Sequence, residues 1–247
     1  MRVAALYDIH GNLPALEAVL EDVRRAGVDE IVVGGDVFPG PMAMEALSLL
    51  DGLTVPTRFI KGNGDRVVLA AKSGSDISEV PAAYRDVIEW GAEGLDDDAA
   101  RKVSAWESRL RLRVTGLGDV FFCHATPRND TEIFTRLTGE DRLVGVFEGI
   151  NGLAVCGHTH MQFDRAVGRT RVVNAGSVGM PFGEPGAYWL LLGPAVGLRR
   201  TDYDAQRAAA RIRNTKYPRA EEFAARNILR PPSEDEMLRA YSRVELR

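Results

Sequence analysis

All four histidines of this 247-residue sequence follow short apolar segments that have the composition of β-strands. Two of them, His158 and His160, are two residues apart in the segment CGHTH. Aspartate and asparagine side chains occupy the same position after other apolar segments. Imidazole nitrogens combined with carboxylate and amide oxygens are the ligands that divalent transition metals prefer. The candidate metal ligands are Asp8, His10, Asp36, Asn63, His124, His158 and His160.

The spacing of these residues allows them to converge. Residues i and i+2 of an extended chain point to the same side, roughly 6.5–7 Å apart, so Asp8 can face the same point as His10. In sheets with parallel strands, ligands bind beyond the carboxyl ends of the strands. A single aspartate after a strand is usually a turn residue or a helix cap, but the common position of all four histidines favours a site. Seven ligands are too many for one tetrahedral ion, so we expect two ions that share a ligand.

Strand-like and helix-like segments alternate in the first part of the chain. The segment 13–26 repeats leucine and valine at helical spacing and ends before Gly27. Alternation of this kind predicts a parallel or mostly parallel sheet. Strands are expected at 2–7, 30–36 and within 55–65, and helices at 13–26 and 41–51.

The remainder of the chain is expected to complete a single domain over residues 1–247. Residues 66–109 have helical spacing and predict a helical insertion beside the site, and the tail from about 204 to 247 is helical in pattern, with Ser233 as an N-cap. Short connections between the later strands predict antiparallel pairing. These strands are expected at 110–115, 118–124, 152–156, 162–167, 170–174 and 187–202.

The composition excludes some classes of protein. A hydrophobic content of 45% and a charged content of 27% are typical of soluble globular proteins. The net charge of −4 disfavours a nucleic acid binder with a broad basic face. The apolar window 187–198 is too short to span a membrane, and no signal peptide is evident, so we expect a cytoplasmic protein. Cys123 and Cys156 are expected to be buried, reduced thiols.

In this order and spacing, the motifs resemble those of the calcineurin-like metallophosphoesterases, in particular the small bacterial and archaeal phosphodiesterase-like members. The motifs are D-x-H at 8–10, G-D at 35–36, G-N at 62–63 with Asp65 close behind, His124, and G-H-x-H at 157–160. The resemblance covers about residues 1–200. It implies an α/β fold (α+β by some schemes), namely a four-layer αββα sandwich with two mixed β-sheets and a dinuclear metal site at the C-terminal ends of strands.

The resemblance also implies a role for each ligand. Asp36 would bridge the two ions together with a water or hydroxide. Mn²⁺ is the first candidate metal, with Fe, Ni, Co or Zn as alternatives. One ion would be held by Asp8, His10 and His160, and the other by Asn63, His124 and His158.

Other polar residues near the motifs have less specific roles. Better-known phosphatases of the family carry a histidine where this chain has Gly64, which weakens the expectation that it cleaves poor leaving groups. Asp65 is expected either to orient a histidine ligand or to cap a helix that begins at Arg66. Asn63 and Arg128 are candidate substrate contacts, with a solvated loop arginine as the alternative for Arg128. Two asparagines, Asn12 and Asn174, are expected to hydrogen-bond loop backbone around the site.

The leading functional hypothesis is a phosphoesterase that hydrolyses phosphodiesters or activated phosphomonoesters through a metal-bridging hydroxide. Its partner would be a small phosphorylated substrate, and a homo-oligomer stays open. A nucleotide or dinucleoside-polyphosphate hydrolase is an alternative. A non-catalytic scaffold on the same fold is disfavoured because all seven ligand positions are filled. A Rossmann-like nucleotide binder is disfavoured because no G-x-G-x-x-G follows the first strand.

Overall fold

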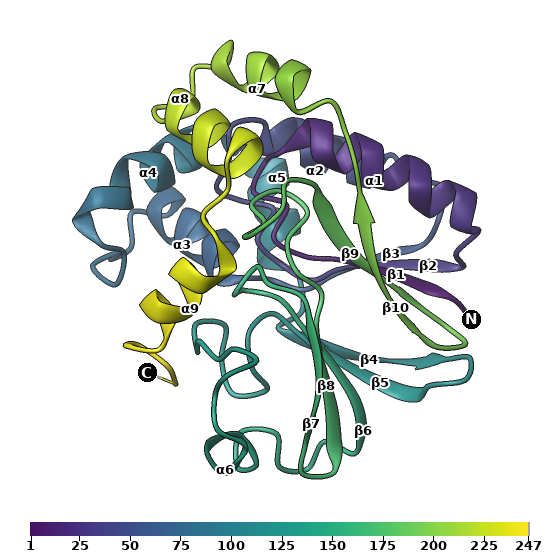
Figure 1. Cartoon of the computed structure of the whole chain (residues 1–247). Coiled ribbons are helices and arrows are strands. Elements are labelled where there is room, and N and C mark those ends of the chain that lie inside the picture. The colour runs from purple at the N-terminus through teal and green to yellow at the C-terminus, as the bar shows by residue number, and fades with distance from the viewer. Residues whose placement is uncertain (247) are drawn as a thin grey trace.

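Two five-stranded mixed sheets face each other in the computed structural model, which describes residues 1–246 (Figure 1). In the first sheet, the three strands β1, β2 and β3 are parallel, and β9 and β10 add an antiparallel edge beside β1. The third strand is shorter than the expected segment. In spatial order the strands are β10 (Val196–Thr201), β9 (Ala187–Leu192), β1 (Val3–Leu6), β2 (Glu30–Val33) and β3 (Thr57–Phe59).

In the second sheet, the pairing follows the length of each connection. The strands β4 and β5 are joined by a short turn and are antiparallel, as are β7 and β8. The long connections between β5, β6 and β8 instead produce parallel pairs. In spatial order the strands are β4 (Arg109–Val114), β5 (Gly118–Cys123), β6 (Gly152–Cys156), β8 (Thr170–Asn174) and β7 (Phe163–Val167).

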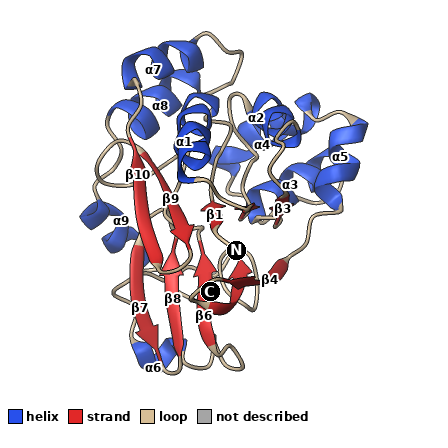
Figure 2. Ribbon diagram, turned by 90° about the vertical axis from the view of Figure 1, so that its right-hand side faces the viewer, coloured by secondary structure: helices blue, strands red, loops and turns tan. Residues whose placement is uncertain are grey.

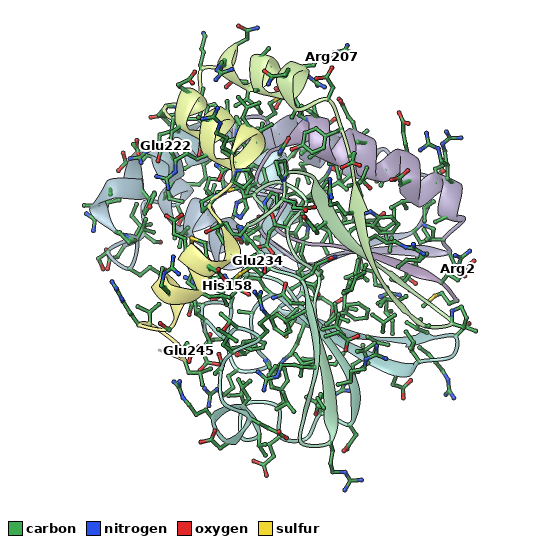
Figure 3. All side chains as sticks on the ribbon, in the orientation of Figure 1. Arg2, His158, Arg207, Glu222, Glu234 and Glu245 are labelled. Carbon is green, nitrogen blue, oxygen red and sulfur yellow. The ribbon has the colours of Figure 1, made fainter. Side chains whose placement is uncertain are left out.

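Alternation along the strands divides the interior into layers. In β1, Ala4 and Leu6 pack against helices, whereas Val3 and Ala5 face the second sheet. Side chains from both sheets fill the space between them (Figure 3). This is the period-two pattern of strands buried on both faces. It holds the carboxyl ends of β1, β2, β5 and β6 in a common region, which is where the predicted ligands follow.

Helices cover the outer face of the first sheet (Figure 2). The predicted helix at 13–26 is confirmed and ends at Gly27, which has the left-handed backbone of a C-cap. The expected helical segment 66–109 begins earlier, because Gly62 is the N-cap and Asp65 lies in the first turn. The helices are α1 (Leu13–Ala26), α2 (Ala43–Asp51), α3 (Asn63–Lys72), α4 (Arg85–Gly94) and α5 (Asp97–Ser104), with a short 3₁₀ turn at Ala82–Tyr84.

The outer face of the second sheet has a thinner cover. Its helix α6 (Glu140–Leu143) has four residues, and the rest of this layer is loop. Phe134 and Phe147 from this segment pack on Cys123 and Cys156 of the sheet. Both cysteines are buried and unbonded, which confirms the prediction of core thiols.

The C-terminal tail is helical, as predicted for the described part of 204–247; residue 247 lies outside the described residues. Ile212, Phe223 and Ile228 of the tail form an apolar cluster with Val87 of α4, which holds the tail against that helix. Ser233 caps the last helix as predicted. No helix in residues 1–246 combines the length and apolar character needed to cross a bilayer. The tail contains α7 (Ala205–Arg213), α8 (Ala220–Phe223), the π-helical turn η2 (Ala224–Leu229) and α9 (Glu234–Tyr241).

Candidate metal centre

The structure brings the seven predicted ligands together in two adjoining groups. In each group of three, the ligand atoms lie within 4.8 Å of one another. Asn63, the first residue of α3, joins the second group, since its Oδ1 lies 3.0 Å from His124 Nε2. The first group is Asp8, His10 and His160, and the second is Asp36, His124 and His158.

Two carboxylates lie between the groups. Asp36 Oδ2 is 3.7 Å from His10 Nε2 and 3.5 Å from His124 Nε2. Asp8 Oδ1 is 3.4 Å from His160 Nε2 and 3.8 Å from His124 Nε2. Asp36 therefore lies between the two groups, and Asp8 also approaches histidines of both.

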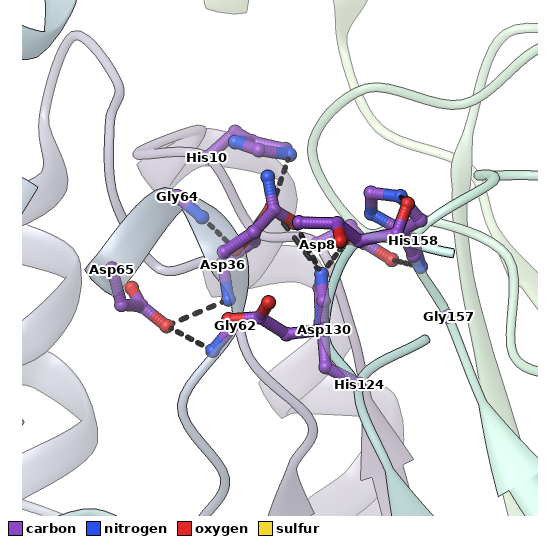
Figure 4. Close-up of polar contacts among 12 residues, drawn as sticks. Asp8, His10, Asp36, Gly62, Gly64, Asp65, His124, Asp130, Gly157 and His158 are labelled. Atoms are coloured by element: carbon purple, nitrogen blue, oxygen red, sulfur yellow. Dashed lines mark hydrogen bonds and ion pairs between the residues drawn. The ribbon is translucent and has the colours of Figure 1, made fainter. Parts of the chain in front are cut away.

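In each of these carboxylates, one oxygen accepts a backbone N–H group and the other faces the site. Asp36 Oδ1 accepts the Gly64 N–H at 2.7 Å, and Asp8 Oδ2 accepts the His158 N–H at 2.8 Å (Figure 4). Asp8 Oδ1 is buried and has no hydrogen-bond partner within residues 1–246. An unpartnered buried carboxylate oxygen is costly, so this atom fits a cation that would lie beside it.

Three imidazoles turn their lone pairs toward the same space. The Nδ1 atoms of His10, His124 and His160 each face a backbone carbonyl, which can only accept a hydrogen bond. In the neutral ring, Nδ1 therefore carries the hydrogen and Nε2 the lone pair. His10 Nε2 and His160 Nε2 face each other at 3.3 Å, so that in the neutral rings two lone pairs point at one space. The carbonyls belong, in the same order, to Pro39, Gly34 and Met180, at 3.3, 2.9 and 2.7 Å.

In the fourth imidazole, that of His158, Nε2 instead of Nδ1 faces a backbone carbonyl. His158 Nε2 lies 3.2 Å from the Thr131 carbonyl, which leaves its Nδ1 with the lone pair. Four imidazoles, two carboxylates and one amide with lone pairs directed inward fit two divalent transition-metal ions.

Backbone strain is concentrated at these ligands. Six non-glycine residues among 1–246 have a positive φ, and five of them are predicted ligands. Such conformations cost on the order of 1–3 kcal/mol each and persist at functional sites where the surroundings enforce them. The five are Asp8 at 54°, His10 at 45°, Asp36 at 56°, His158 at 66° and His160 at 59°.

The carboxylates are held in the ionised form. Burial by itself raises the pKa of Asp8 and Asp36, but the imidazoles around them reverse the shift. The pKa of Asp8 is lowered by His160 and then His124, and that of Asp36 by His124 and then His10. Burial is also the main reason that the pKa of His10 is lowered. A negatively charged centre of this kind attracts cations.

The pKa values of the other three histidines shift in different directions. Burial and the neighbouring charge of His124 lower the pKa of His158 to about 4. Burial opposes protonation of His124 too, but Asp36 and Asp8 outweigh it and raise its pKa to about 10. In the same way, Asp8 raises the pKa of His160 against its burial. Metal ions that bind these rings would compete with protons for them.

Asp65 positions Asp36, whereas the sequence predicted a contact to a histidine or an N-cap. Its carboxylate accepts the backbone N–H groups of Asp36 at 2.8 Å and Gly62 at 2.9 Å (Figure 4). It also accepts the N–H of Phe38 at 3.0 Å. Burial and the charge of Asp36 raise the pKa of Asp65 to about 7, against the N–H donors of Gly62 and Phe38, which favour the carboxylate. Asp65 thus connects the first turn of α3 to the loop that carries Asp36.

Gly64 lies where no side chain fits. A Cβ there would approach the Phe38 carbonyl oxygen to 2.3 Å and Asp36 Oδ1 to 3.0 Å. The glycine allows α3 to approach the loop closely enough for its N–H to reach Asp36. The local packing therefore excludes a histidine at this position, where the better-known phosphatases of the resembling family carry one.

Gly64→Ala is expected to destabilise the fold by about 2 kcal/mol or more, because the contact is with backbone that cannot rotate away. Gly94→Ala is the matched control, since a Cβ at that helical position meets nothing within 4 Å. Urea unfolding of both variants measures the difference. Equal stability of the two variants would contradict this account of Gly64.

The other predicted polar residues have defined partners. Arg128 hydrogen-bonds Glu132 through Nε at 3.1 Å, and its half-exposed guanidinium lines a pocket with His124. Asn12 donates to the Gly179 carbonyl at 2.9 Å, and Asn174 to the Gly157 carbonyl at 2.7 Å. The prediction that these asparagines support loops is confirmed.

Some groups at the centre carry no sequence signal. The carbonyls of Pro39, Gly34, Met180 and Thr131 orient the imidazoles, yet any residue type supplies a carbonyl. Phe182 stacks on His160, with ring centroids 5.3 Å apart, and only its place in the loop after Met180 could have indicated it.

Comparisons with known proteins agree with this geometry. Residues 1–192 match the family model described as the calcineurin-like phosphoesterase superfamily domain. The uncharacterized protein MJ0912 of Methanocaldococcus jannaschii is 25% identical over 236 residues, which are 87% of this chain and 93% of that protein.

Solved structures share the fold. The structure of a metallophosphoesterase from Sphaerobacter thermophilus aligns with this chain with a TM-score of 0.68 and 25% sequence identity. The alignment covers 91% of this chain and 97% of the Sphaerobacter chain. The hypothetical protein PH1004 from Pyrococcus horikoshii OT3 has a TM-score of 0.77 at 22% identity, covering 94% of this chain and 99% of its own. Both contain the two-sheet sandwich described above.

Proposed function

Because this chain belongs to the calcineurin-like phosphoesterase superfamily, we propose that it hydrolyses phosphodiesters or activated phosphomonoesters with two bound transition-metal ions. The observation that carries the proposal is the 3.3 Å approach of His10 Nε2 to His160 Nε2 beside the unpartnered Asp8 Oδ1. Asp8, His10 and His160 would hold one ion; Asn63, His124 and His158 would hold the other, with Asp36 contacting both. Mn²⁺ is the first metal to test.

Two such ions, when bound, acidify a water molecule for attack on phosphorus and neutralise the phosphoryl oxygens. The chain itself holds the metal ligands in fixed positions. Backbone carbonyls fix the ring orientation of the histidines, and Asp65 fixes the loop of Asp36. Outer contacts of this kind set ligand geometry and raise metal affinity.

A basic pocket beside His124 is suited to the anionic substrate. It has a volume of about 280 Å³, and its lining includes Lys61, Arg66, Arg109 and Arg128. Arg66 and Arg128 pair with carboxylates. Lys61 donates to the Ser104 carbonyl and Arg109 to the Pro127 carbonyl, which leaves their charges without an anionic partner in these contacts. Cations in this position would attract a phosphate.

The same pocket favours a second candidate function. A polyphosphate chain carries several charges, and Lys61 and Arg109, whose contacts are with carbonyls, could bind it beside one ion. A nucleotide or dinucleoside-polyphosphate hydrolase is therefore the alternative. A panel of bis(p-nitrophenyl) phosphate, p-nitrophenyl phosphate and diadenosine polyphosphate separates the candidates by relative kcat/KM.

Removal of metal is expected to abolish turnover of aryl phosphodiesters and to lower the melting temperature, because ions that bind only the folded chain stabilise it. Saturation at 100 times Kd contributes about 2.7 kcal/mol. Chelation, dialysis and readdition of Mn²⁺ should restore both properties. Full activity of a chain shown to be metal-free by mass spectrometry would overturn the proposal.

A further inference from the structure

A second pocket, of about 390 Å³, opens beside His10 on the other side of the centre. Its volume is in the range of small-molecule sites. Residues next to α4, the loop after Met180 and the C-terminal tail form its lining, and most of them are apolar or aromatic. They include Tyr84, Ile88, Phe182, Tyr217, Phe223 and Met237. We refer to it as the aromatic pocket.

The aromatic pocket adjoins the first ligand group directly. His10 is part of its lining, and Phe182, also in the lining, stacks on the ring of His160. The basic pocket contains His124 of the second group. A phosphoester at the centre would therefore have one pocket beside each predicted ion.

The tail that completes the aromatic pocket lies outside the family match. Residues 1–192 match the family, whereas Tyr217, Phe223 and Met237 come after them. Figure 3 shows Glu222, another lining residue, on the tail helix α8. The pocket is thus formed in part by a segment that follows the family match.

The lining indicates the chemistry of the occupant. Tyr84 is 54% exposed, with the guanidinium carbon of Arg219 5.4 Å from its ring centroid, and Phe182 is half-buried. Exposed aromatic rings that line a pocket favour a flat, apolar group through stacking and edge contacts. Arg226 adds a positive charge to the lining and can stack on such a ring.

We propose that the aromatic pocket binds an aromatic group, aryl or nucleobase, attached to the phosphoryl group of the substrate. The inference rests on the proposed function for the position of the phosphoryl group at the metal centre.

Binding of non-hydrolysable phosphonates tests it without turnover. Phenylphosphonate is expected to bind the Mn²⁺-loaded chain about tenfold more tightly than methylphosphonate, by calorimetry. The methylene phosphonate analogue of AMP distinguishes the two sources: tighter binding than phenylphosphonate indicates a nucleobase, and weaker binding an aryl group. Equal Kd values for phenyl- and methylphosphonate, or no binding of phenylphosphonate, would overturn the inference.

Variants of lining residues test whether the aromatic pocket causes the preference for phenylphosphonate. Tyr84→Ala and Met237→Ala are each expected to reduce the ratio of the two Kd values about threefold, whereas Tyr84→Phe retains the ring and the ratio. Leu137→Ala is the matched control, because Leu137 is 69% exposed and is not in the lining. Preference for phenylphosphonate in a chain that hydrolyses no phosphoester would leave this inference standing and refute the proposed function.

Discussion

Asp36→Ala is expected to reduce kcat/KM for an aryl phosphodiester by about a thousandfold, because Asp36 Oδ2 lies within 3.7 Å of His10 and 3.5 Å of His124. In the proposed centre, loss of the shared ligand would weaken both ion sites, and the ions would supply several kcal/mol of transition-state stabilisation. Mass spectrometry of the reconstituted variant should show fewer than two ions per chain. His124→Ala is expected to have the same effect on turnover.

The variant should remain folded. Removing the Asp36 carboxylate leaves the Gly64 N–H without its acceptor, which costs about 1–3 kcal/mol. It also removes a negative charge that raises the pKa of Asp65, so part of the cost is offset. Circular dichroism checks the fold, and Asp119→Ala, at an exposed strand position, is the matched control. Wild-type kcat/KM in Asp36→Ala would refute the assignment of the centre.

Asp65→Ala is expected to have the second largest effect, and to act on both stability and metal binding. It leaves three buried N–H groups, those of Asp36, Phe38 and Gly62, without an acceptor. At about 1 kcal/mol or more for each, the free energy of unfolding falls by roughly 3 kcal/mol. Displacement of the Asp36 loop should also weaken Mn²⁺ binding about 10- to 100-fold.

Asp65→Asn separates positioning from stability. Its amide oxygen can still accept two N–H groups, but the NH₂ would face the N–H of Phe38, so binding weakens while most of the fold is kept. Asp96→Ala is the control, since Asp96 caps α5 through the Ala99 N–H and its loss costs about 1 kcal/mol of stability. Unchanged Mn²⁺ affinity in both Asp65 variants would show that Asp65 has a structural role only.

The sequence by itself determined the ligand types and their place at strand ends. Apolar runs of strand length reveal where β1, β2, β5 and β6 end, and parallel strands in a sheet deliver their carboxyl ends to one edge. Local patterns suffice for this because strand periodicity and chain order act over a few residues. The same reasoning identified Gly27 as a helix stop and the two cysteines as core thiols.

Only the tertiary structure decided three features of the site. They are the N–H groups that Asp65 accepts, the exclusion of a side chain at Gly64 and the orientation of each imidazole. Each depends on backbone from another element, as when the Met180 carbonyl holds His160 or the Phe38 carbonyl blocks position 64. The aromatic pocket likewise exists only because the tail packs on α4 beside Phe182. A backbone carbonyl is present at every residue, so only the packing of distant segments selects which one meets a given side chain.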